Sequence, residues 1–131
     1  MASTGGFKEL AVYQLAEEMA DAVWDIVRGW DALARDTVGK QLIRSADSVG
    51  ANIAEGCGRQ SYQDNRRFVR IARGSLYETQ HWLRRAFRRK LLTKEQITAL
   101  QPLLANLAPR LNAYLKSIGR SAGAGSSTND Q

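Results

Sequence analysis

The chain has 131 residues, a formal net charge of +6 and a single cysteine, Cys57. This length predicts one small domain, and a lone cysteine excludes an intramolecular disulfide and a cysteine-rich metal site. The chain has no apolar run of about 18 residues and no signal-peptide pattern, which disfavours a membrane protein and predicts a cytoplasmic one.

Charge is divided unevenly along the chain. Residues 1–58 carry five Lys/Arg and nine Asp/Glu, a net of −4, whereas residues 59–90 carry ten and two, a net of +8. The remaining residues contribute +2. A mildly acidic half joined to a strongly basic segment indicates an anionic partner, although this asymmetry does not bear on the fold.

Residues 1–6 are small and polar, which predicts a flexible N-terminus. The first predicted helix runs from Lys8 to about Arg28, and its apolar positions spread over more than half of its circumference. Its narrow polar face is acidic and consists of Glu18, Asp21 and Asp25. The surplus of apolar surface, which includes Trp24 and Trp30, predicts burial against a second subunit. The alternative is that both tryptophans pack in a monomeric core.

The second predicted helix follows a connection at Gly29–Asp36 and ends at Gly56. Beside its apolar stripe lies a second stripe of short, mostly uncharged polar side chains. This polar stripe consists of Gln41, Ser45, Ser48, Asn52 and Glu55. Short hydrogen-bonding residues favour the close approach of another helix, either at an oligomer interface or within the chain. Gly56 and Gly58 are predicted to close the helix through the left-handed conformation.

The third predicted helix runs from Tyr62 to Arg89, with Ser61 as its N-cap. One face carries a stripe of arginines together with a tyrosine and a histidine. These residues are Arg66, Arg67, Arg70, Arg73, Tyr77, His81, Arg84, Arg85, Arg88 and Arg89. Arginine suits bidentate phosphate contact, and an aromatic ring between arginines can stack on an unpaired base. The stripe is therefore predicted to bind RNA or another nucleic acid.

The opposite arc of this helix is predicted to enter the core and includes Ile71, while Gly74 is predicted to let the second helix approach closely. Two other interpretations of the arginine stripe stay open. The arginines can pair with Glu18, Asp21 and Asp25 of a neighbouring subunit, or they can serve only solubility. Because the excess of +8 is larger than the deficit of −4 in the first half, some arginines are expected to remain unpaired.

The sequence offers no catalytic constellation. His81 is the only histidine, and neither a second metal ligand nor a nucleophile lies at helical spacing from it. Glu55 and Glu78 are predicted to be partly buried hydrogen-bond acceptors rather than an acid–base pair. We therefore predict no enzyme activity, no metal and no cofactor. Membrane binding by the basic helix is disfavoured because its apolar arc is needed for the core.

The fourth predicted helix begins at a capping box formed by Thr93 and Gln96 and ends near Ile118–Gly119. Pro102 and Pro109 lie inside its leucine-rich pattern, and each removes one intrahelical hydrogen bond. We expect a kinked helix, with a break near one proline as the alternative. Residues 119–131 have no apolar face and are predicted to be a disordered tail.

Two segments, SVGANIAEGCGR at residues 48–59 and FVRIARGSLYE at residues 68–78, resemble the helices of a bacterial family. This family comprises the four-helix bundle proteins encoded in intervening sequences of 23S ribosomal RNA genes, and the resemblance covers about Phe7 to Ile118. It implies an all-helical subunit that assembles into a ring, typically a pentamer, and an association with RNA. A related accessory protein of diversity-generating retroelements is a basic pentamer that binds nucleic acid and a reverse transcriptase. The resemblance transfers no catalytic residue.

Residues 7–118 are therefore predicted to form an all-α, antiparallel, up-down-up-down four-helix bundle. We expect a non-catalytic homo-oligomer that binds RNA through the arginine face of the third helix. The alternative is a scaffold for a protein partner, in which the charges serve assembly and solubility.

Overall fold

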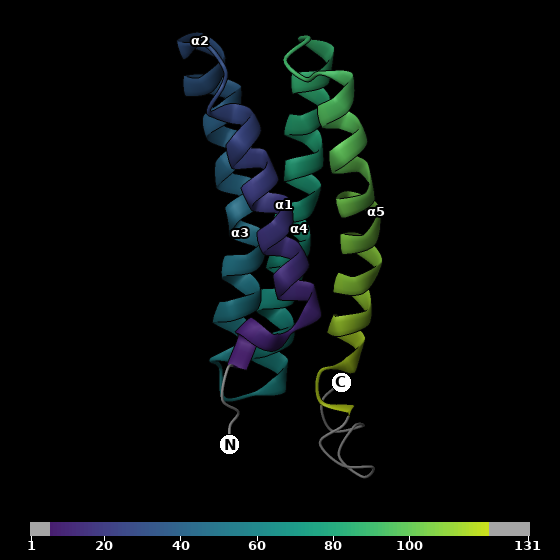
Figure 1. The fold of residues 1–131 in the computed structure, drawn as a ribbon. Helices are drawn as coiled ribbons and strands as arrows, with labels where there is room; N and C mark the ends of the chain where they lie inside the picture. The colour runs from purple at the N-terminus through teal and green to yellow at the C-terminus, as the bar shows by residue number, and fades with distance from the viewer. Residues whose placement is uncertain (1–5, 121–131) are drawn as a thin grey trace.

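Residues 6–120 are described by a computed structural model and contain helices but no strand. The long helices alternate in direction and form the predicted bundle (Figure 1). They are α1 at Ala11–Val27, α3 at Lys40–Cys57, α4 at Tyr62–Arg88 and α5 at Lys94–Ser117. The all-α fold class and the four-helix architecture are thus confirmed.

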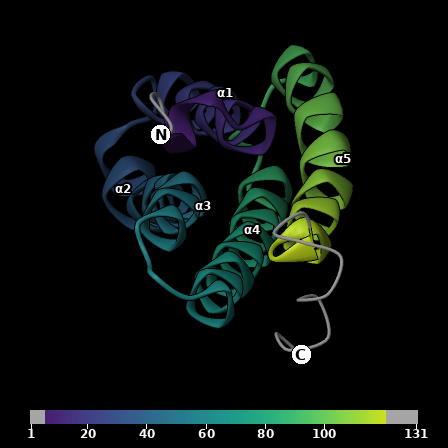
Figure 2. The same cartoon turned by 90° about the horizontal axis from the view of Figure 1, so that it is seen from below.

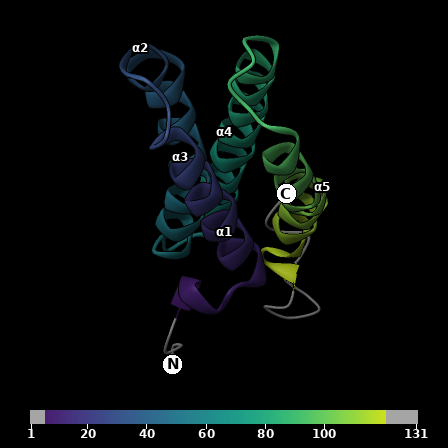
Figure 3. The ribbon, with the colours of Figure 1, turned by 45° about the horizontal axis from the view of Figure 1, so that its top comes forward.

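Seen along its axis, the bundle places α1, α3, α4 and α5 in a closed circuit around one core (Figure 2). Each helix turns an apolar stripe inward, as expected for a bundle whose helices bury one face. The largest fully buried apolar side chains are Met19, Leu42, Ile53, Leu76, Leu107 and Leu111. The short helix α2 (Ala32–Ala34) and the α4–α5 connection lie at one end of the bundle, opposite the start of α1 (Figures 1 and 3).

The helix caps read from the sequence are confirmed. Ser61 caps α4, because its hydroxyl accepts a hydrogen bond from the Asp64 backbone N–H at 3.0 Å. Thr93 and Gln96 form the reciprocal capping box of α5, with N···O distances of 3.1 and 2.9 Å. Each cap satisfies backbone N–H groups that have no partner within the helix.

The first helix begins later than predicted. A 3-10 turn at Gly6–Glu9 comes first, and Leu10 then adopts an extended backbone, with φ −73° and ψ 128°, before α1. The Phe7 ring packs edge-on against Tyr13 at 4.9 Å between centroids, which holds the turn against α1. The Lys8 carbonyl accepts a hydrogen bond from the Gln14 side chain at 2.9 Å. These contacts stabilise the turn where it folds back onto α1, and helical periodicity alone does not predict this arrangement.

The predicted connection at Gly29–Asp36 is wrong in length. Asp31 caps a new helical segment by accepting from the Ala34 N–H at 3.0 Å, and this segment passes through a π-helix at Arg35–Gly39 directly into α3. The wider π turn brings the backbone of Gly39 against α1, where an added Cβ would lie 2.6 Å from Val27 Cγ1. The connection outside helical structure is therefore only a few residues long.

Two predictions about glycines are also wrong. Gly58 ends α3 with φ −83°, so the helix does not close through a left-handed glycine. Gly56 instead permits a close approach, because an added Cβ would lie 2.5 Å from Asn65 Oδ1 and 3.1 Å from the Asn65 carbonyl oxygen. Gly74 was expected to admit α3, yet nothing lies within 4 Å of the position its Cβ would take.

The fourth helix continues through both prolines, so the alternative of a break is wrong. Pro102 and Pro109 are exposed, which places their missing hydrogen bonds toward solvent rather than toward the core. The predicted start of the disordered tail at Gly119 is wrong, because Gly119 is buried and has a φ of 89°. The rest of that tail, residues 121–131, and residues 1–5 of the predicted flexible N-terminus lie outside the described part of the chain.

Candidate nucleic-acid interface

The long helix α4 presents one face to solvent between α3 and α5. Its buried side chains occupy the opposite arc and are Val69, Ala72, Leu76, Thr79, Leu83 and Ala86. Ile71 was predicted to join them but is 42% exposed. Val69 is buried in its place, so the helix is rotated slightly from the predicted orientation. The predicted arginine stripe lies along the exposed face and its two edges.

Two arginines of the predicted stripe are used to join α4 to α5. Arg66 donates a hydrogen bond to the Ile118 carbonyl at 2.8 Å, and Arg73 donates to the Asn112 side-chain oxygen at 3.1 Å. Both side chains are half-buried. A hydrogen bond from a charged donor is among the stronger kinds in proteins. These two arginines therefore have a structural role, whatever else they bind.

A third arginine belongs to a compensated cluster at the start of α4. Arg67 pairs with Asp64 at 3.0 Å and its guanidinium lies 4.5 Å from the centroid of the Phe68 ring. Arg59 lies 4.6 Å from the same ring and pairs with Glu55 at 2.8 Å and with Asp64 at 3.6 Å. Both arginines have carboxylate partners, so this end of the helix offers little uncompensated charge.

The remaining members of the stripe form the α4 basic patch. The α4 basic patch consists of Arg70, Tyr77, His81, Arg84, Arg85, Arg88 and Arg89. None of its five arginines forms an ion pair with another residue of the described chain, 6–120. Arg85 is half-buried and the other four are exposed. Tyr77 is 57% exposed between Arg70 and the C-terminal arginines, and His81 packs edge-on against Trp82 at 4.7 Å.

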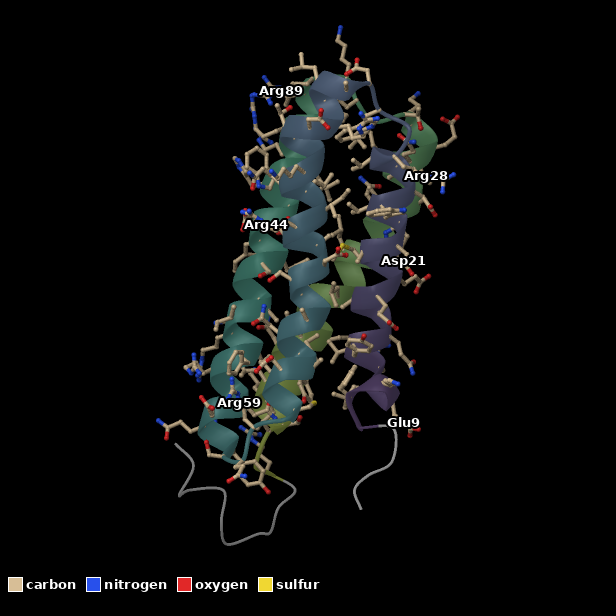
Figure 4. The ribbon with its side chains drawn as sticks, turned by 90° about the vertical axis from the view of Figure 1, so that its left-hand side faces the viewer. Glu9, Asp21, Arg28, Arg44, Arg59 and Arg89 are labelled. Carbon is tan, nitrogen blue, oxygen red and sulfur yellow. The ribbon has the colours of Figure 1, made fainter. Side chains whose placement is uncertain are left out.

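Most of the labelled arginines lie on the opposite side of the bundle from the labelled carboxylates, and Arg28 is the exception on the α1 side (Figure 4). In Figure 4, Arg44, Arg59 and Arg89 lie on the side of α3 and α4, whereas Glu9 and Asp21 lie on the side of α1. Arg44 is exposed and, within residues 6–120, has no ion-pair partner. It was missed because it stands alone beside the polar stripe. The spacing of four residues between Lys40 and Arg44 places both on the same outward face of α3, and this spacing could have indicated a basic surface there.

The acidic side chains of α1 do not neutralise the α4 basic patch within one chain. Asp25 pairs instead with Arg28, the residue that directly follows α1, at 4.0 Å, and both side chains are exposed. Neither Glu18 nor Asp21 forms an ion pair with another described residue. Pairing of these carboxylates with arginines of another subunit stays open.

The predicted polar stripe of α3 faces α4 within the chain over part of its length. Ser45 lies 3.0 Å from the Thr79 hydroxyl and Ser48 lies 2.9 Å from the Ser75 hydroxyl. Asn52 donates to the Ser48 hydroxyl at 2.9 Å, and Gln41 is half-buried. These short side chains let the two helices approach closely.

Two glutamates and two tryptophans complete the set of predicted residues. Glu55 and Glu78 are exposed rather than partly buried, and they accept hydrogen bonds from Arg59 and Trp82, respectively. Trp24 is 54% exposed. Trp30 is half-buried, and its ring nitrogen has no hydrogen-bond partner in the described chain. A role for the two tryptophans in an oligomer interface stays a prediction.

No group of three or more His, Cys, Asp or Glu side chains in residues 6–120 is placed to hold a metal ion. Cys57 is half-buried, and its sulfur lies 3.4 Å from the Tyr114 hydroxyl. Burial and this contact raise the pKa of the Tyr114 hydroxyl well above its ordinary value, which keeps the phenol neutral. None of the helices in the described chain combines the length and apolar character needed to span a membrane.

Comparison with known proteins places the bundle among its relatives. Residues 8–113 match the family model described as 23S rRNA-intervening sequence protein. The chain belongs to this family. A crystal structure of a protein of unknown function from the S23 ribosomal protein family of Bacteroides thetaiotaomicron has a similar fold, with a TM-score of 0.71. It is 25% identical in sequence, over 81% of this chain and 99% of that chain. No curated protein matches the chain significantly.

The family match spans all of α4, so the α4 basic patch lies within the region shared by 23S rRNA-intervening sequence proteins. The resemblance stated from the SVGANIAEGCGR and FVRIARGSLYE segments is thereby confirmed. The more distant likeness to the accessory protein of diversity-generating retroelements stays a prediction.

Proposed function

We propose that this 23S rRNA-intervening sequence protein is a non-catalytic homo-oligomer that binds RNA through the α4 basic patch. The observation that carries the proposal is the row of arginines on α4 without ion-pair partners in the described chain. From Arg70 to Arg88 the helix rises about 27 Å at 1.5 Å per residue. A row of that length reaches several phosphates of one strand.

Single-stranded RNA fits the patch better than a duplex does. Tyr77 and His81 lie among the arginines, and an exposed ring can stack on a base that has left its helix. The deep, narrow major groove of duplex RNA does not admit side chains to its base edges. We therefore expect tighter binding of single-stranded or looped RNA.

Assembly would strengthen binding through repetition of the patch. Single phosphate contacts at a wet surface are weak, but several patches held by one oligomer bind the same RNA with high avidity. Family resemblance makes five the expected number of subunits. The exposed Trp24 supports assembly, because an aromatic side chain of this size is a frequent anchor of protein interfaces.

A second candidate function is a scaffold for a protein partner. Phe87, at the C-terminal end of α4, is 55% exposed, and Ile71 is 42% exposed on the same helix. Apolar side chains beside unpaired arginines also suit an acidic protein surface. Retention of a partner after nuclease treatment, with loss on mutation of Phe87, would favour this function over RNA binding.

The test of RNA binding is a titration of fluorescent single-stranded RNA with the full chain at several salt concentrations. The logarithm of the association constant should fall linearly with the logarithm of salt concentration, by about 0.7 per phosphate contacted. An RNA duplex of the same length serves as the comparison and should bind more weakly. Affinity that does not change with salt would overturn the proposal.

A further inference from the structure

An open groove separates α4 from α5 near the C-terminal end of α4. Its volume is about 320 Å³, and its walls include Leu83 and Phe87 of α4 and Ile97, Leu100 and Leu104 of α5. Leu83 and Leu100 are almost fully buried at its base, whereas Phe87 is 55% exposed at its edge. More than half of the Phe87 surface is therefore left uncovered by residues 6–120. The groove is therefore apolar and can accept a large apolar side chain.

The edge of this groove carries a positive charge. Arg84 lines the groove one turn before Phe87 and has no ion-pair partner among the described residues. An occupant that carries an apolar side chain and an adjacent carboxylate would satisfy both features. Attraction between that carboxylate and Arg84 would favour one orientation of the occupant in the groove.

The chain itself presents these two groups together on α1. Trp24 is 54% exposed, and Asp21 lies one helical turn before it, so both project from neighbouring positions on the surface of that helix. Asp21 forms no ion pair in the described chain. Asp47 of α3 lies in the same shallow depression as Asp21, and partial burial together with the Asp21 charge raises the pKa of its carboxyl. Within residues 6–120, negative charge at this site therefore has no ion-pair partner.

We infer that Trp24 of one copy docks into the α4–α5 groove of a second copy, with Asp21 beside Arg84 of the partner subunit. Docking would bury the indole and the Phe87 edge and would neutralise two charges that have no ion-pair partner in the described chain. Tryptophan and arginine are the residue types that most often dominate the energy of an interface. The inference rests on the homo-oligomer part of the proposed function and names its contact.

The two halves of this contact lie on different helices, so the interface is heterologous. Each copy offers one Trp24 and one groove, and successive copies add head to tail until a ring closes. Arg84 would then serve assembly, while Arg70, Arg88 and Arg89 would remain for RNA. The two roles of the basic helix are thereby assigned to different side chains.

The test measures the mass of the full chain by light scattering, with circular dichroism to verify helix content. Trp24→Ser and Phe87→Ser should each reduce the mass to that of one chain, 14.5 kDa. A mixture of the two variants should form a pair of twice that mass, because one retains the groove and the other retains Trp24. Ile71→Ser removes an apolar side chain of α4 outside the groove and should leave the wild-type mass unchanged.

A charge exchange makes the test independent of folding defects. Asp21→Arg and Arg84→Asp should each weaken assembly, and the two changes in the same chain should restore it. A wild-type chain that is monomeric, single variants that keep the wild-type mass, or a mixture that stays monomeric would each overturn the inference. Binding of a short RNA that spans one patch should be unchanged in Trp24→Ser, so loss of assembly and loss of RNA binding are told apart.

Discussion

The Thr79 hydroxyl lies 3.0 Å from the Ser45 hydroxyl across the contact between α3 and α4. Both side chains are buried, at 0% and 2% exposure, and they are the polar side chains of the described core. Ser48 and Ser75 repeat the arrangement at 2.9 Å, one turn away along α3. The two pairs explain why part of the α3 face is polar yet uncharged. Short hydroxyl side chains satisfy one another where the helices are too close for longer ones.

Thr79→Val should destabilise the bundle because it leaves the Ser45 hydroxyl with fewer partners in the core. We expect a loss of about 1 kcal/mol in the free energy of unfolding, measured by urea denaturation. The double variant Thr79→Val with Ser45→Ala should lose less free energy of unfolding than the two single variants added together, because the unsatisfied Ser45 hydroxyl is then absent. Thr98→Val, at an exposed position of α5, is the control. Equal effects at Thr79 and Thr98 would contradict this account of the contact.

The two glycines Gly56 and Gly74 should respond to alanine in opposite directions. At Gly56 the added methyl meets the Asn65 backbone carbonyl oxygen at 3.1 Å and its side chain at 2.5 Å. We therefore expect a loss of about 1–3 kcal/mol from overpacking. At Gly74 nothing lies within 4 Å, so alanine should add about 0.5–1 kcal/mol through helix propensity. Thermal unfolding of both variants checks the pair, and a gain at Gly56 would refute the close approach.

Asp47 should make stability depend on pH. Asp47 lies at the surface, and partial burial of its carboxyl, followed by the charge of Asp21, raises the pKa of that carboxyl in the folded state. The folded state then binds this proton more tightly than the unfolded chain does. Its contribution is therefore favourable at low pH and is lost as pH rises from the unfolded value of about 3.9 through the raised folded one.

Asp47→Asn should accordingly unfold at a higher urea concentration than the wild type at neutral pH. The difference should shrink and vanish as pH falls below the titration range of an ordinary aspartate. Glu18→Gln, which removes one carboxylate at an exposed position of α1, is the matched control. A stabilising effect of Asp47→Asn that stays constant down to low pH would rule out the carboxyl as its source.

Tyr77 should contribute base stacking to RNA binding. Tyr77→Leu should lower the affinity for single-stranded RNA by about 1–3 kcal/mol, the range observed for loss of a base–aromatic stack. Tyr77→Phe keeps the ring and should bind nearly as well as the wild type. Tyr62→Leu changes a tyrosine that is 44% exposed at the start of α4 and should have no effect on affinity. Fluorescence anisotropy with one labelled RNA compares all three, and equal affinities would exclude stacking at this position.

The local features of the fold could be predicted from the sequence. Ser61 and the Thr93–Gln96 pair act within one turn of chain, so their roles follow from residue type and spacing alone. The exposed face of α4 follows equally from the helical period. By contrast, the start of α1 depends on a fold-back of Phe7 onto Tyr13, for which the apolar spacing carries no signal.

The candidate site could be predicted only in part, because contacts distant in sequence decide which arginines are available. Arg66 and Arg73 share the helical face of Arg70, yet they bind residues in α5 or directly after it, 52 and 39 positions further along the chain. Helical periodicity does not tell these three arginines apart. Gly74 was misassigned for a similar reason, since a small rotation of α4 decides which of its residues meets α3.

Reversal of three arginines tests the central claim most directly. Arg70, Arg88 and Arg89 lie in the α4 basic patch without ion-pair partners in the described chain. Arg28, Arg35 and Arg110 are exposed outside α4. Changing either set to glutamate alters the net charge equally. Affinity for single-stranded RNA should be lost in the first triple variant, while the second should bind RNA with the salt dependence of the wild type. Equal affinities of the two triple variants would show that α4 does not form the RNA-binding surface.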